Sequence, residues 1–121
     1  MSAVEFLRLV LLFLHFIGLA VLLGAFVAQL REPAVEGRRR PATGMLHGAL
    51  TQLVTGVALV GLREGALDLP VDNTKIAVKL GVVVVLLALV IVGRRKTLGP
   101  AAFWAIGGLA VLNVGIAVFW V

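Results

Sequence analysis

The chain has 121 residues, of which 61% are hydrophobic and 14% are charged, and its mean hydropathy is +1.12. Soluble domains are about 45–50% apolar and about 25% charged, so this composition argues against a soluble globular fold and against disorder. The length fits a single domain, residues 1–121. The absence of cysteine excludes a disulfide scaffold, thiol catalysis and cysteine-ligated zinc or iron–sulfur centres.

Four stretches of the chain are candidates for membrane-spanning helices, which need about 20 mostly apolar residues. They are residues 6–30, 43–62, 74–93 and 101–121. The first stretch is longer than the apolar region of a signal peptide, about 7–15 residues, so we expect it to remain as a helix. Prolines and charged residues fall in the connectors, where helices should end. Short connectors then predict an all-α, antiparallel four-helix bundle that is integral to a membrane.

The net charge of +5 comes from basic residues in two of the three connectors. The first and third connectors hold seven arginines and lysines, whereas the second holds two, offset by acidic residues. Positive connectors usually face the cytoplasm, which predicts that both termini lie on the outer face of a cell membrane, inner or plasma. The arginine run at 38–40 is too short to indicate nucleic-acid binding. The seven are Arg31, Arg38, Arg39, Arg40, Arg94, Arg95 and Lys96.

Small residues recur every four positions in two of the apolar stretches. In lipid, this spacing lets helix backbones approach closely. We expect these rows to pack the bundle internally, with a homo-oligomer interface as the alternative. The rows are Ala20, Gly24 and Ala28 in the first stretch and Gly44, Gly48, Gln52 and Gly56 in the second.

Each apolar stretch also carries at least one polar residue in the part predicted to lie in the outer half of the bilayer. Polar residues inside a membrane are costly and are therefore candidates for functional roles. With a rise of about 1.5 Å per residue, they fall at similar depths, so we predict that they face one another inside the bundle. His47 lies nearer the cytoplasmic end and is expected to contact headgroups or nearby backbone instead. The group, called the polar layer below, is His15, Gln52, Thr55, Lys79 and Asn113.

Two members of the polar layer could bind a cofactor. Histidine is the common axial ligand of haem iron, and neutral imidazole binds metals generally. Lys79 could act as a ligand, as a base, or as the cation that holds a propionate or another anionic group. Gln52, Thr55 and Asn113 would then line the same site. The alternative is that His15 makes an interhelical hydrogen bond and that Lys79 extends to the membrane interface.

The sequence around these residues resembles a known family. The segments LHFIG at 14–18, TGVAL at 55–59 and TKIAVKL at 74–80 resemble elements of the HemJ-type protoporphyrinogen oxidases and the related CopD-like membrane proteins. The resemblance implies a four-helix membrane protein that binds haem b, with His15 at the haem iron and Lys79 at the same site.

The sequence is compatible with three functions. The first is haem binding in the polar layer, and the second is a non-catalytic accessory, scaffolding or self-associating membrane subunit. The third is transport of a small solute or ion by an oligomer. The expected partners are the bilayer and either further copies of the chain or a larger membrane complex. Whether the protein is an enzyme is also open, because no nucleotide-binding motif, HExxH motif or carboxylate pair lies within a span.

Overall fold

The computed structural model describes residues 2–62 and 73–119. It contains helices α1 (Ala3–Leu30), α2 (Thr43–Gly61), α3 (Asn73–Lys96) and α4 (Pro100–Phe119). By length and composition, these four helices could each cross a membrane. Outside the helices, the described ranges contain two isolated β-bridges, one between Val35 and Arg38 and one between Arg39 and Leu98. The predicted all-α class with four membrane-length helices is confirmed, whereas the acidic second connector at 63–72 lies outside the described residues.

The helix ends differ slightly from the predicted ones, for reasons of capping. α1 begins at Ala3 because the side chain of Ser2 accepts a hydrogen bond from the backbone nitrogen of Glu5, at 3.1 Å. α3 continues through the basic residues to Lys96, since cations are favourable at a helix C-terminus. α4 begins at Pro100, because proline is well suited to the first helical position.

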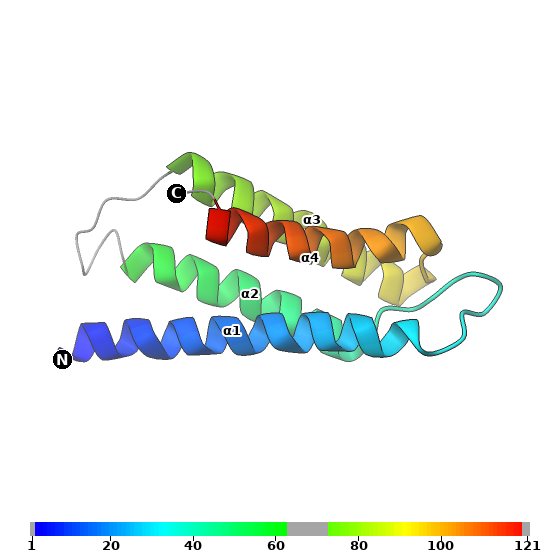
Figure 1. Cartoon of the computed structure of the whole chain (residues 1–121), viewed down its shortest axis with the longest axis horizontal. Coiled ribbons are helices and arrows are strands. Elements are labelled where there is room, and N and C mark those ends of the chain that lie inside the picture. The colour runs from blue at the N-terminus through cyan, green and yellow to red at the C-terminus, as the bar shows by residue number, and fades with distance from the viewer. Residues whose placement is uncertain (1, 63–72, 120–121) are drawn as a thin grey trace.

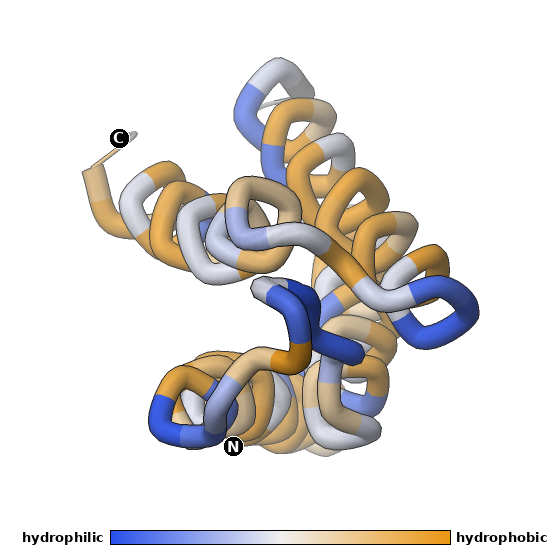
Figure 2. The backbone as a smooth tube through the Cα atoms, turned by 90° about the vertical axis from the view of Figure 1, so that its right-hand side faces the viewer, coloured by the Kyte–Doolittle hydropathy of each residue, from blue (hydrophilic) through white to orange (hydrophobic). Residues whose placement is uncertain are grey.

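The helices are arranged as two hairpins, α1–α2 and α3–α4, in which consecutive helices run in opposite directions (Figure 1). α1 packs most extensively on α2, α3 packs on α4, and α2 packs on α3. The contact between α1 and α4 is the smallest, and the diagonal pairs α1–α3 and α2–α4 have no close backbone approach. In an end-on view the helices are mostly hydrophobic, and hydrophilic residues gather in the connectors (Figure 2).

The buried apolar core lies in the half of the bundle next to the first and third connectors. Its largest buried side chains include Phe103, Met45 and Ile106. In the opposite half, the buried side chains include Gln52, Thr55 and Asn113. The apolar core therefore fills one half of the bundle, whereas the other half also buries polar side chains. The core consists of Leu22, Phe26, Met45, Ala49, Leu86, Val90, Leu98, Phe103, Ile106 and Ala110.

The two rows of small residues have different environments. In α2, a Cβ atom placed on Gly48 would lie 2.7 Å from the backbone nitrogen of Leu22 and 2.8 Å from the carbonyl oxygen of Gly18. The α2 row thus packs internally, as expected. The expectation of internal packing is wrong for the α1 row, since Ala20, Gly24 and Ala28 are exposed and nothing lies within 4 Å of a Cβ on Gly24.

The first and third connectors are joined at the same end of the bundle. The backbones of Arg39 and Leu98 form a β-bridge, with N–O distances of 2.9 and 2.7 Å. The Arg38 guanidinium donates to the hydroxyl and the carbonyl of Thr97, both at 2.9 Å, and Arg40 donates to the carbonyl of Arg94. The two basic connectors therefore form one hydrogen-bonded unit across both hairpins.

Candidate functional site

His15 on α1 contacts Thr55 on α2. The distance between His15 Nδ1 and Thr55 Oγ1 is 2.7 Å. The Thr55 hydroxyl donates to the carbonyl of Thr51, one turn earlier in α2. Since that bond uses its only hydrogen, Thr55 Oγ1 must accept from His15, which assigns the proton of the neutral imidazole to Nδ1. The other ring nitrogen, Nε2, is then the unprotonated one and makes no hydrogen bond to a described residue.

Gln52 ties the same two helices together by a second bond. Its amide nitrogen donates to the backbone carbonyl of His15, and its side chain is buried. This bond needs a close approach of the helices, which Gly18 allows. A Cβ on Gly18 would lie 2.7 Å from Thr51 Cγ2 and 3.3 Å from Gln52 Nε2. Gly18 and Thr51 therefore shape the site, although neither belongs to the predicted polar layer.

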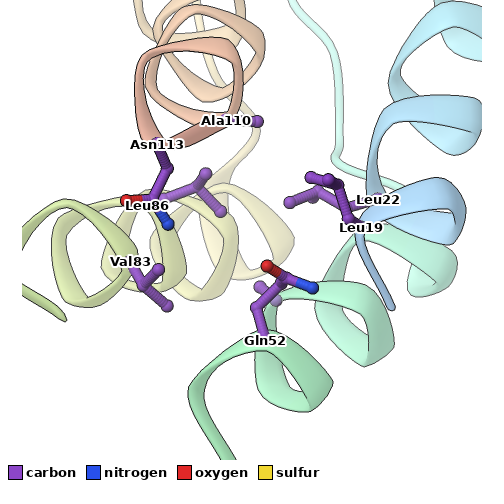
Figure 3. Close-up of a pocket in the computed structure, with 8 residues that line it drawn as sticks. Leu19, Leu22, Gln52, Val83, Leu86, Ala110 and Asn113 are labelled. Atoms are coloured by element: carbon purple, nitrogen blue, oxygen red, sulfur yellow. The ribbon is translucent and has the colours of Figure 1, made fainter. Parts of the chain in front are cut away.

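Asn113 on α4 lies opposite Gln52 across a small cavity (Figure 3). The side chain of Asn113 is buried, and its oxygen Oδ1 has no hydrogen-bond partner among the described residues. The cavity has a volume of about 10 Å³, which is about the minimum that can hold one water molecule.

Lys79 and His47 lie at the edge of this arrangement or outside it. Lys79, on α3, is half-buried and within electrostatic range of His15. His47 is exposed on α2, on the part of the helix near the basic connectors. The structure thus brings together His15, Thr55 and Gln52 directly, and it places Asn113 across the cavity from Gln52.

The direct contacts of the polar layer are interhelical hydrogen bonds. In the described part of the chain, no group of three or more histidine, aspartate or glutamate side chains could hold a metal ion. The groups available for chemistry at the site are the unprotonated imidazole nitrogen of His15, the side-chain amine of Lys79 and two buried amides. Such groups can bind a hydrogen-bond donor or provide a single ligand to a metal-containing cofactor.

Comparison of the chain with protein-family models, with curated proteins and with solved structures finds no match.

The described interior does not fit a haem beside His15. Pockets for ligands of that size usually have volumes of about 300–1,000 Å³, whereas the cavity at Gln52 and Asn113 has about 10 Å³. Its lining residues do not include His15. The unprotonated Nε2 nitrogen of His15 is the feature of the described site that suits an axial ligand best. A haem on this nitrogen would therefore have to lie outside the interior of the described bundle.

Proposed function

We propose that the chain is a multi-pass protein of the cell membrane, with the basic connectors in the cytoplasm and both termini outside. The bridge between Arg39 and Leu98 supports this orientation, because it brings the two positive connectors to the same end of the bundle. Four helices of membrane length with their net positive charge at one end are typical of an inserted protein that obeys the positive-inside rule.

Cysteine labelling tests the orientation directly, because the chain has no cysteine of its own. We expect Val35→Cys, near Arg39, to resist a membrane-impermeant thiol reagent in intact cells, because this connector faces the cytoplasm. Leu67→Cys, beside Asp68, should be labelled. Both positions should react in permeabilised cells, which is the control for accessibility. Labelling of Val35→Cys and protection of Leu67→Cys in intact cells would reverse the proposed orientation.

We further propose that the protein is a non-catalytic, self-associating membrane subunit. The observation that carries this proposal is the exposed row of Ala20, Gly24 and Ala28 on α1. The comparable row on α2 packs against α1, and Gly48 is buried there. In lipid, helices associate through such small-residue faces because their backbones can approach closely. The polar layer supports the non-catalytic part of the proposal, since its bonds hold α1 and α2 of the same chain together.

Two glycines of this chain offer a matched test of self-association. A Cβ on Gly24 or on Gly108 meets nothing within 4 Å, so leucine fits at both positions in the isolated bundle. We expect Gly24→Leu to reduce the mass of the complex in detergent, because its side chain would separate two α1 helices. Gly108→Leu, on α4, should leave the mass unchanged. Native mass spectrometry measures both, and equal masses for the two variants and the original protein would refute an interface at Gly24.

Haem binding is the second candidate, and the free Nε2 of His15 is the observation in its favour. The absorption spectrum of the purified protein separates the two proposals. A subunit that binds no haem has no Soret band. A Soret band that is lost in His15→Ala and retained in His47→Ala would support haem binding outside the described interior and would replace the first proposal.

A further inference from the structure

The end of the bundle where the first and third connectors meet carries positive charge that no described carboxylate neutralises. Seven arginines and lysines lie in or beside these connectors, and their hydrophilic stretches gather at this end (Figure 2). The acidic residues of the two connectors are Glu32 and Glu36. Within residues 2–62 and 73–119, neither of them forms an ion pair with an arginine. This end of the bundle therefore suits an anionic partner.

Two of the arginines are held at the junction between the connectors. Arg40 donates through Nη1 to the backbone carbonyl of Arg94, and Arg94 donates through Nη1 to the backbone carbonyl of Pro41, at 2.9 Å. The two guanidinium groups therefore lie between the same two backbone segments, one from each hairpin. Carbonyl oxygens are neutral acceptors, so these bonds fix the positions of the guanidinium groups and leave their charge in place.

The same two guanidinium groups keep the donors that best suit a phosphate. An arginine has five N–H donors, and the bonds above use only Nη1 of each group. Nε and Nη2 of both arginines have no partner in the described part of the chain. These two nitrogens form the planar fork that can bind two oxygens of one phosphate. In Arg38, by contrast, Nε and Nη2 are already bound to Thr97.

The position of this junction identifies where the phosphate would come from. Arg94 lies in the last turn of α3, and Arg40 lies shortly before the start of α2 at Thr43. Both helices have the length and composition of membrane spans, so their ends lie at the level of the lipid headgroups. Clusters of basic residues beside a membrane span attract anionic lipids.

We propose that Arg40 and Arg94 together bind the phosphate of an anionic phospholipid, each donating Nε–H and Nη2–H to its oxygens. The headgroup then connects the first hairpin to the second at the membrane surface. A zwitterionic lipid fits less well, because the other basic residues of this end repel its cation. The inference does not depend on which end of the bundle faces the cytoplasm, so it stands apart from the proposed orientation and from self-association.

Native mass spectrometry of the full-length protein in detergent tests this binding, with phosphatidylglycerol as the anionic probe and phosphatidylcholine as the zwitterionic one. We expect the original protein to bind phosphatidylglycerol more tightly. Arg40→Gln and Arg94→Gln should each weaken that binding roughly tenfold or more, because each removes hydrogen bonds to a charged group. Equal affinities of the original protein for the two lipids would overturn the proposal, and this comparison needs no variant.

Two further variants separate a defined site from general attraction by charge. Arg95→Gln removes the same charge from an exposed position beside Arg94. It should change the affinity for phosphatidylglycerol by about twofold or less, because salt screens a charge that does not contact the phosphate. Arg40→Lys keeps the charge but loses the fork, so it should recover only part of the affinity. Equal losses from Arg95→Gln and Arg40→Gln would overturn a site at the junction.

Inorganic phosphate is the last probe, because it has the same oxygens without acyl chains. We expect it not to displace phosphatidylglycerol at equal concentration, since the acyl chains of the lipid also contact the apolar helices. Displacement would show that the junction binds a free anion, and it would overturn the assignment to a lipid.

Discussion

Replacement of Gly48 by leucine is expected to separate α1 from α2 and to prevent the first hairpin from forming. The backbone of α1 lies directly over Gly48, so that even a Cβ atom would meet Leu22 N at 2.7 Å and Gly18 O at 2.8 Å. Neither atom can move without moving the helix, because both belong to its backbone. Overpacking of this kind typically costs about 1–3 kcal/mol, so we expect about this loss from alanine and a larger loss from leucine.

Thermal unfolding in detergent measures this effect, and Gly81 provides the control. Gly81 lies on α3, and a Cβ atom added there would meet nothing within 4 Å, so Gly81→Leu adds the same apolar volume without a clash. Gly81→Leu should unfold at nearly the original temperature. In Gly48→Leu, the separation of α1 from α2 should also break the hydrogen bond between His15 and Thr55. An unchanged unfolding temperature for Gly48→Leu would mean that α1 and α2 do not pack at this glycine.

Replacement of Arg39 by alanine is expected to destabilise the end of the bundle where the basic connectors meet. The Arg39 guanidinium donates to the carbonyl of Gln29 and, at 2.7 Å, to that of Glu32, so it satisfies carbonyl groups at the end of α1. It also lies 5.5 Å from the ring centre of Phe103, a fully buried member of the core. Charged hydrogen bonds and a cation–π contact together predict a loss of about 2–4 kcal/mol.

Two control variants separate these contacts from the effect of charge. Arg95→Ala removes the same positive charge from an exposed position in the basic end of α3, and it should have little effect on unfolding. Arg39→Lys keeps the charge but loses the planar donor group, so it should recover only part of the stability. Unfolding temperatures in detergent measure all three variants. Equal losses from Arg39→Ala and Arg95→Ala would show that charge alone, and not the contacts of Arg39, stabilises this end.

The helices themselves were predictable because each is encoded locally. Length and apolar composition mark the four membrane-length segments, and prolines and charges mark their ends. The observed helix ends differ from the predicted ones where a single capping contact sets the first residue of the helix, as Ser2 does for α1. Capping adds or removes a turn without changing the hydropathy that defines a span, so a pattern of apolar residues cannot locate it.

The polar layer was predictable in depth and less so in its contacts. Depth follows from the helix rise, which placed His15, Thr55 and Gln52 at a level where they do meet. The role of Gly18 was missed because it depends on which face of α1 meets α2. Two faces of α1, one with Gly18 and one with Gly24, carry small residues and could each pack against another helix. Which face meets α2 depends on the rotation of α1 about its own axis, and the sequence does not show that rotation.

The contacts of the basic connectors were also beyond sequence reasoning. The positive-inside rule concerns the location of arginines and gives no information about their partners. Arg38 and Arg39 bind backbone carbonyl groups, which every residue has and which therefore leave no mark in the sequence. Thr97, which makes this contact, has a positive φ of 74°. Because β-branched residues rarely adopt positive φ, the sequence does not predict this conformation.

The bridge between the basic connectors has a consequence for the order in which the protein assembles. Arg39 reaches its partners at the end of α1 as soon as the first connector is made, because Gln29 and Glu32 precede it in the chain. Its backbone partner Leu98 is synthesised only after the whole of α3. The first hairpin can therefore close while the ribosome is still translating, whereas its attachment to the second must wait for the third connector. We therefore expect assembly in two stages, with Arg39 making contacts in both.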